Sequence, residues 1–247
     1  MRQTIYNRRY GSRTSLRLRG CVQAASRTLV VFIAVIALDA QATASLPKGL
    51  MLNLDLQQIE NGLIPNKTLY PLHVPLGDLD TATNNSNRVL LMLEAGQGLD
   101  IPHSSLLDPD GGGWVATVRL FALTDGMVMS QGNDENGYAI YIKEGAVHAA
   151  IRTSHSTITL KERPENGITH CLNTWVTIEV KIQPEMAILI LNRARVAIAP
   201  LQTPLRGEDY HVRVGEHKTL PAPLRRDTTA TTTGFTGAIS SLKLLRQ

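Results

Sequence analysis

The sequence predicts an all-β fold in which two antiparallel sheets pack face to face. Three observations lead to this prediction. Apolar and polar residues alternate with a period of two, turn-forming residues separate the alternating segments, and no stretch of twelve or more residues keeps helical spacing. In segment 175–182, Val, Ile, Val and Ile alternate with Thr177, Glu179 and Lys181. Successive side chains of a strand point to opposite faces of a sheet, so one side of this strand is expected to face a core.

The other expected strands follow the same alternation. They cover residues 114–122, 138–143, 147–153, 186–191, 195–199, 211–215 and 238–245. Glu144-Gly145 between two of these segments predicts a hairpin, and segment 50–62 could carry one short helical turn. Many short strands with frequent turns are typical of sandwiches, so we expect one domain from residue 45 to 247.

The first 44 residues have the three parts of a secretory signal peptide. Seven arginines precede an unbroken apolar run of ten residues, 29–38, and the small-x-small sequence Ala42-Thr43-Ala44 follows it. A helix needs about 20 apolar residues to span a bilayer, so this run is too short for an ordinary anchor. We therefore expect residues 1–44 to be cleaved, leaving a secreted or periplasmic protein with no membrane span. The alternatives are an uncleaved anchor and an organelle transit peptide.

The charge and the cysteines exclude several classes of function. Beyond residue 44 the chain holds 18 basic and 20 acidic side chains, a net charge of −2, and aromatics make up 4% of the sequence. Both observations argue against nucleic acid as a partner. Cys171 is the one cysteine after the leader, so neither an intrachain disulfide nor a zinc site built on cysteines is expected. Cys171 is expected to be a small buried residue.

The sequence offers no recognisable catalytic constellation. Glycoside cleavage needs two carboxylates about 5–10 Å apart, but segment 175–182 contains only Glu179, and most other carboxylates lie in turns. No Gly-x-Ser-x-Gly elbow, His-Glu-x-x-His pair or phosphate-binding Gly-x-x-x-x-Gly-Lys loop occurs. The sequence therefore favours a protein that is not an enzyme, with a glycoside hydrolase of the same fold as an alternative.

The order of several short segments resembles the laminin G-like, or concanavalin A-like, jelly-roll domains. The likeness covers most of residues 50–245. It includes segment 98–102 (GLDIP), the strand 114–121, the Trp-led segment 175–178, and the closing segment 234–242 (GFTGAISSL), which is the most specific. The resemblance implies a two-sheet antiparallel jelly-roll sandwich that binds sugars or proteins, often with the help of calcium.

Calcium is the cofactor to be considered for such a domain. It takes six to eight oxygen ligands, and the loop 133–136 (NDEN) groups such oxygens just before an expected strand. The resemblance implies that Asp134 or Asn136 matches a family calcium ligand, with Asp227 as a second ligand from a loop near the end. The alternative is a solvated hairpin loop that holds no metal.

These observations favour a secreted, non-catalytic domain that binds carbohydrate, extracellular matrix glycans or a glycosylated extracellular partner. Tyr141, His148 and Arg152 fall on the side of adjacent strands that we expect to face outward, so they are the candidate ligand-binding residues. The alternative is a structural protein–protein interaction domain that works through exposed strand edges.

Overall fold

The computed structural model describes residues 49–94, 96–132, 135–161, 171–207, 211–215 and 234–247, which belong to one compact unit, Ala44–Gln247. Within these residues no helix is long and apolar enough to cross a membrane. The elements are β1 (Leu50–Asn53), β2 (Leu63–Pro65), β3 (His73–Pro75), β4 (Asp80–Asn84), β5 (Asn87–Met92), β6 (Gly98–Ile101), the 3₁₀ helix η1 (Ser105–Leu107), β7 (Trp114–Ala122), β8 (Gly126–Gly132), β9 (Gly137–Lys143), β10 (Ala146–Arg152), β11 (Thr157–Lys161), β12 (Trp175–Gln183), β13 (Met186–Leu191), β14 (Ala194–Pro200), β15 (Val212–Gly215) and β16 (Gly237–Arg246).

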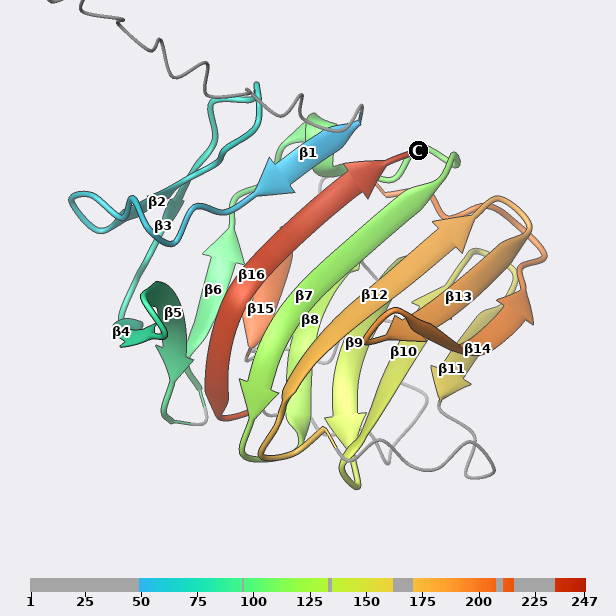
Figure 1. The fold of residues 1–247 in the computed structure, drawn as a ribbon. Coiled ribbons are helices and arrows are strands. Elements are labelled where there is room, and N and C mark those ends of the chain that lie inside the picture. Colours follow the sequence, from blue (N-terminus) through green and yellow to red (C-terminus); the bar gives the residue numbers. More distant parts are fainter. Residues whose placement is uncertain (1–48, 95, 133–134, 162–170, 208–210, 216–233) are drawn as a thin grey trace, which may run out of the picture. The chain divides into compact units, whose positions relative to one another are not determined.

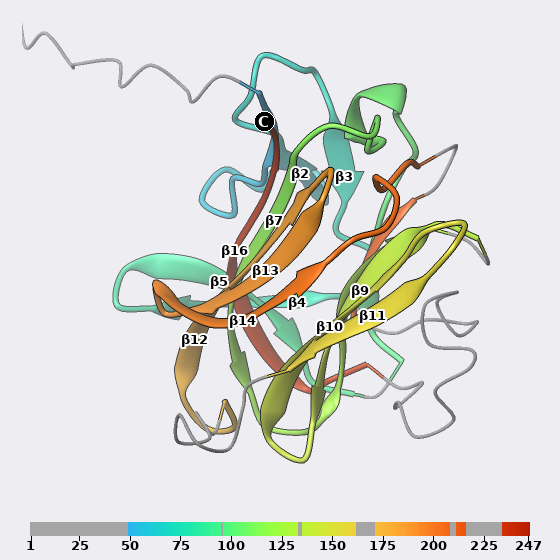
Figure 2. The same ribbon diagram turned by 90° about the vertical axis from the view of Figure 1, so that its right-hand side faces the viewer.

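The predicted fold class is confirmed: the domain is an antiparallel two-sheet sandwich. An eight-stranded sheet runs β14-β13-β12-β7-β16-β5-β4, with β1 also paired to β16, and a six-stranded sheet runs β11-β10-β9-β8-β15-β6. Figure 1 shows the eight-stranded sheet in front of the six-stranded sheet, and Figure 2 shows the two layers from the side. Strands β2 and β3 form a separate two-stranded sheet.

All eight expected strands are present, and their ends differ from the expected ones by at most one residue. The expectations for 114–122 and 186–191 match β7 and β13. Strands β4 and β5 were not predicted, because their sequences lack a clear alternation of apolar and polar residues. Strand β11 (TITLK) was also not predicted, although Ile158 and Leu160 alternate with polar residues. No helix forms in segment 50–62, so the expected helical turn there is wrong. Its first residues, Leu50–Asn53, form strand β1, which pairs with the longer strand β16.

Tight turns set the register of the long hairpins. The predicted β9–β10 hairpin is confirmed, with Lys143 opposite Ala146 and positive φ angles of 54° at Glu144 and 73° at Gly145. A two-residue hairpin turn with positive φ at both residues is a type I′ turn, and its twist matches the twist of the paired strands. Glycine adopts a positive φ without strain. The Asp125 carboxylate accepts hydrogen bonds from the backbone N–H groups of Glu144 (2.6 Å) and Gly145 (2.9 Å), which holds the turn against the start of β8.

The core lies between the two sheets. It is built from the inward side chains of both layers, among them Val118 and Ile178 of the eight-stranded sheet and Ile140 and Ile151 of the six-stranded sheet. Cys171 is buried as expected, and its Sγ donates to the carbonyl of Gly145 at 2.9 Å.

Trp114 and Tyr138 are among the largest side chains that are fully buried. Burial raises the pKa of the Tyr138 hydroxyl well above its ordinary value, and the neighbouring Trp114 indole opposes part of that shift. The low polarity of the core disfavours the tyrosinate anion, so this hydroxyl stays neutral in the folded protein at pH values where a solvated tyrosine ionises.

Tyr138→Phe tests this burial at high pH. In the unfolded chain a tyrosine ionises near pH 10, whereas the buried Tyr138 hydroxyl stays neutral. Below pH 10 Tyr138 therefore does not change the free energy of unfolding with pH. Above pH 10 its contribution lowers the free energy of unfolding by about 1.4 kcal/mol for each pH unit. The variant lacks this contribution and should lose less stability from pH 10 to pH 11.5. Denaturant unfolding followed by circular dichroism at each pH measures the difference. Equal slopes for both proteins would contradict the burial of this hydroxyl.

Candidate functional site

The outward side of the eight-stranded sheet carries a row of solvent-accessible polar and aromatic side chains. Because β7 and β12 bury one set of side chains in the core, their other set points away from it. Antiparallel pairing brings these outward residues together across the two strands: Trp175 lies opposite Phe121, Thr177 opposite Arg119, and Glu179 opposite Thr117. We call the outward side chains of β7, β12, β13 and β16 the open face, and Figure 1 shows the ribbon of these strands from that side.

One end of the open face is aromatic. The rings of Phe121 and Trp175 are 5.8 Å apart between centroids and tilted by 52°. The guanidinium of Arg119 lies 5.3 Å from the centre of the Trp175 ring, within reach of a cation–π attraction. Trp175 and Phe121 are half-buried and Arg119 is exposed, so this group presents both ring surface and a positive charge to solvent.

The middle of the open face is polar. Lys181 Nζ and Glu179 Oε1 form an ion pair of 3.1 Å on adjacent outward positions of β12. Thr117 of β7 lies opposite Lys243 of β16, which is exposed. This part of the face therefore offers hydroxyl, carboxylate and ammonium groups to a ligand, all held on regular strands.

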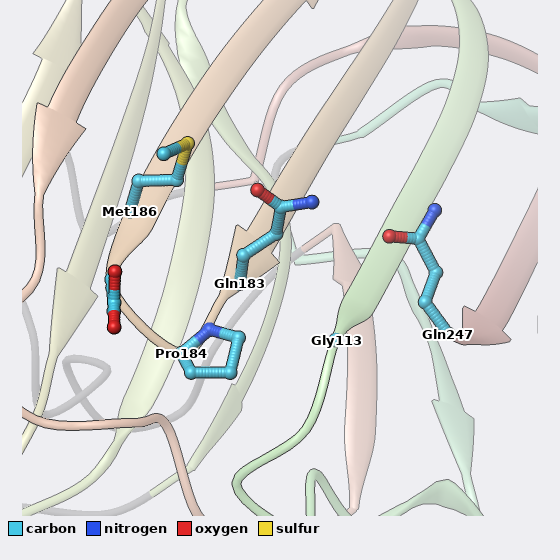
Figure 3. A pocket seen from close by; sticks show the side chains of 6 residues that line it. Gly113, Gln183, Pro184, Met186 and Gln247 are labelled. Carbon is cyan, nitrogen blue, oxygen red and sulfur yellow. The ribbon is translucent and has the colours of Figure 1, made fainter.

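A hollow lies beyond the other end of β12. Its volume is about 350 Å³, and it is lined by Gly113, Gln183, Pro184, Glu185, Met186 and Gln247. Figure 3 shows the side chains of Gln183 and Gln247 on the two sides of Gly113, with their amides projecting in the same direction. A Cβ atom at position 113 would lie 2.7 Å from Cβ of Gln247, so this space depends on Gly113 having no side chain.

The three candidate ligand-binding residues all lie on the outward side of the six-stranded sheet. Tyr141 of β9 is directly opposite His148 of β10, and their rings stack at 5.0 Å with an interplanar angle of 18°. Arg152 is on the same side of β10, and its Nη1 lies 3.5 Å from the Thr157 hydroxyl. The expectation of an exposed aromatic there is not met, because Tyr141 is only 1% exposed.

Tyr141 is buried together with three other residues of the six-stranded sheet. Tyr141, Met127, Ala139 and Ala150 form a second apolar cluster, on the opposite side of the sheet from the main core. His148 and Arg152 at the margin are half-buried. The six-stranded sheet is thus apolar on both sides near its centre, and it presents less side-chain surface to a ligand than the open face does.

The calcium candidates fall mostly outside the part of the chain that the structure describes. Asp134 and Asp227 lie outside the described residues, and Asn136 is described as half-buried, next to the start of β9. In the described ranges no group of three or more His, Cys, Asp or Glu side chains could hold a metal ion. Asn136 supplies one amide oxygen, whereas calcium needs six to eight oxygens, so the described residues alone do not complete a calcium site.

Sequence reasoning missed the open face as a binding surface, although the signal was present. The outward positions of segment 175–182 were recognised as polar, and Thr117 and Arg119 occupy the matching positions of segment 114–122. The pairing of these two segments was the missing information. Phe121 lies 54 residues before Trp175 in the chain, and the two residues contact each other only because β12 pairs with β7.

Comparison with known proteins identifies the family. Residues 121–247 match the model of the laminin G domain, and since this segment is more than half of the chain, the protein belongs to the laminin G domain family. The predicted resemblance is thereby confirmed. No sequence of a curated protein matches the chain.

Solved structures share the fold at low sequence identity. The binding domain of Paraclostridial Mosquitocidal Protein 1 matches with a TM-score of 0.60 and 8% identity over 81% of this chain and 49% of that one. The binding domain of Botulinum Neurotoxin serotype G matches with a TM-score of 0.59 and 10% identity over 80% and 48%. The chain thus spans about half the length of these two toxin domains. Domain 4 of AbnA, an extracellular arabinanase from Geobacillus stearothermophilus, in complex with arabinotriose, matches with a TM-score of 0.55 and 12% identity over 80% and 92%.

Proposed function

We propose that this protein is a secreted, non-catalytic domain that binds carbohydrate through the open face of its eight-stranded sheet. The observation that carries the proposal is the group of Trp175, Phe121 and Arg119, which is accessible to solvent beside a row of polar side chains. A sugar ring has an apolar face of C–H groups and a rim of hydroxyls. Aromatic rings flanked by hydrogen-bonding groups complement both parts.

The charge distribution of the open face supports binding over catalysis. Among the outward side chains of β7, β12, β13 and β16, the one carboxylate is Glu179. Acid-base cleavage of a glycosidic bond needs a second carboxylate about 5–10 Å away, and Glu179 is also paired with Lys181. Turnover of a polysaccharide that disappears in Glu179→Gln would contradict this part of the proposal.

Export through a signal peptide of residues 1–44 remains part of the proposal. A domain that binds extracellular glycans needs to leave the cytoplasm, and the leader has the parts that secretion requires. Protein recovered outside the cytoplasm should therefore begin at Ser45, which mass spectrometry of the intact chain measures directly.

A structural interaction domain is the second candidate, and one observation favours it. Ile198 on the edge strand β14 is 51% exposed and lies opposite Ile188 on β13, so the open face has an apolar margin beside a strand edge. Exposed edges with apolar side chains are sites where chains pair with one another. A stable oligomer that Ile198→Lys dissociates, in a protein that binds no polysaccharide, would favour this candidate.

Trp175→Ala should weaken carbohydrate binding. Truncation of a central aromatic anchor costs about 2 kcal/mol or more, so the dissociation constant for a polysaccharide that binds should rise roughly thirtyfold. Polysaccharides are first selected by the increase they produce in the melting temperature of residues 45–247, and affinities are then measured by titration calorimetry.

Matched arginine variants locate the binding surface. Arg119→Ala removes the cation beside Trp175 and should weaken binding, whereas Arg206→Ala removes an exposed arginine elsewhere and should leave the affinity unchanged. Arg152→Ala tests the sequence-predicted surface on the six-stranded sheet. Loss of binding in Arg152→Ala with normal binding in Trp175→Ala would place the ligand on that sheet and contradict the proposed surface.

Calcium binding by Asp134, Asn136 and Asp227 also stays a proposal, which thermal unfolding can test. A bound ion stabilises the native state by mass action, so calcium should raise the melting temperature of residues 45–247 and chelation should reverse the increase. Asp134→Ala should abolish the increase while leaving the metal-free melting temperature nearly unchanged. An unchanged melting temperature at millimolar calcium would show that the loop 133–136 is a hairpin loop without a metal.

A further inference from the structure

Strands β2 and β3 form a corner of the domain on the side of β1, away from β12 and β13 (Figure 1). Ile64 of β2 and Val74 of β3 lie opposite each other and are fully buried in the main core. Their neighbours along each strand therefore point away from the core. These outward side chains, with those of residues 58–61, line a second hollow of about 220 Å³, which we call the corner hollow. Its lining residues are Gln58, Glu60, Asn61, Leu63, Pro65 and His73.

Backbone hydrogen bonds hold the walls of the corner hollow in place. Glu60 and Leu63 exchange two of them, at 2.8 and 3.1 Å, around the turn formed by Asn61 and Gly62. The Gly62 carbonyl accepts a further hydrogen bond from the N–H of Leu76 at 2.8 Å, which ties this turn to the end of β3. The lining side chains therefore project from paired backbone. A site whose frame is already fixed loses less conformational entropy when a ligand binds.

The corner hollow combines apolar surface with one negative charge. Leu63 and Pro65 supply the apolar part, Glu60 is the one carboxylate of the lining, and no lysine or arginine lines the hollow. In the part of the chain that the structure describes, the Glu60 carboxylate takes part in no ion pair. The neighbouring cation, Lys67, is already paired at 2.9 Å with the buried Asp55. An alkyl stem that ends in a positive charge complements both the apolar surface and Glu60.

The size and the polar groups of the corner hollow suit one basic side chain. Sites for drug-sized molecules have volumes of about 300–1,000 Å³, and this hollow is smaller. The side-chain carbonyls of Gln58 and Asn61 add acceptors for the N–H donors of an ammonium or guanidinium group. A metal ion fits less well. Glu60 and His73 are the only two His, Cys, Asp or Glu side chains of the lining, and no metal-binding group of three occurs in the described ranges.

The loop 66–72, which connects β2 to β3, presents an apolar side chain next to the corner hollow. Leu69 is 91% exposed. The side-chain amide of Asn66 donates to the Thr68 hydroxyl at 2.7 Å and to the Tyr70 carbonyl at 3.2 Å, so the loop is anchored on both sides of Leu69. Single exposed leucines are common on protein surfaces. A leucine on an anchored loop beside a preformed hollow is, however, well placed to insert into the surface of another protein.

We propose that the corner hollow and Leu69 together form a docking site for a partner protein. The partner inserts a lysine or arginine side chain beside Glu60, and it receives Leu69 in an apolar pocket of its own. Charge complementarity and the small volume of the hollow argue for a basic side chain, and the exposed Leu69 argues for a macromolecular source of that side chain. The site lies away from the open face, so this inference goes beyond the proposed function and does not depend on it.

Selection from displayed peptides tests the docking site. A library of random nine-residue peptides is selected against residues 45–247, and the affinities of the enriched peptides are measured by titration calorimetry. The enriched peptides should carry a lysine or arginine close to large apolar residues. Glu60→Gln should weaken their binding about threefold, the effect of losing one exposed ion pair. Leu69→Ser should weaken it roughly tenfold, because the contact of one buried leucine is lost.

Matched variants separate the docking site from general effects. Glu94→Gln and Leu123→Ser each remove an exposed side chain of the same type elsewhere on the domain, and both should leave the peptide affinity unchanged. Trp175→Ala alters the open face and should also leave it unchanged. Melting temperatures equal to that of the parent protein show that each variant is folded. Raising the salt concentration should weaken peptide binding more in the parent protein than in Glu60→Gln.

The outcomes distinguish this inference from the proposed function. Selection that enriches no peptide, or only peptides whose binding is insensitive to both Glu60→Gln and Leu69→Ser, would overturn the docking site and leave carbohydrate binding in place. Binding of n-butylammonium as tight as that of the enriched peptides would overturn the protein partner, because the hollow would then be a site for a free amine. Failure of the proposed function is seen separately, as absence of saccharide binding by the parent protein.

Discussion

The antiparallel pairing of β7 with β12 is the constraint on which the domain and its candidate site both depend. These two nine-residue strands lie side by side through eight residue pairs, from Trp175 opposite Phe121 to Ile182 opposite Trp114. One side of the pair contributes aliphatic residues to the core, and the other contributes the Trp175, Phe121 and Arg119 group. A shift of the register by one residue would exchange the two sides, so the burial of the core also fixes the positions of the outward side chains.

The two sheets differ in what their outward sides can do. In the eight-stranded sheet the outward positions of β7 and β12 are mostly polar or aromatic and remain accessible to solvent. In the six-stranded sheet Tyr141 is buried with Met127, Ala139 and Ala150, so its aromatic ring contributes to packing. The binding proposal therefore follows from accessibility: both sheets carry an aromatic residue on the outward side, but only on the open face is that ring solvent-accessible beside unburied polar groups.

The sequence predicts the fold well and the site in part, for identifiable reasons. Alternation finds β7, β12 and β13 because each buries one side and exposes the other, whereas β4 (DTATN) has no apolar member except Ala82 and is detectable only through its pairing with β5. Tyr141 was expected to be exposed because a period of two does not reveal whether the outward side is covered. The small apolar residues Ala139 and Ala150 beside it were the available indication. The hollow depends on residues that meet only in the fold, since Gly113 and Gln247 are 134 positions apart.

The most direct test of the account is to map the ligand onto the two sheets by nuclear magnetic resonance of residues 45–247, with a polysaccharide that binds. The account predicts that the indole N–H of Trp175 and the methyl groups of Ile188 and Ile190, on the open face, change their chemical shifts on titration. The methyl groups of Met127, Ala139 and Ala150 should remain unchanged. Shifts confined to these three residues would contradict the central claim, because they would place the ligand on the six-stranded sheet.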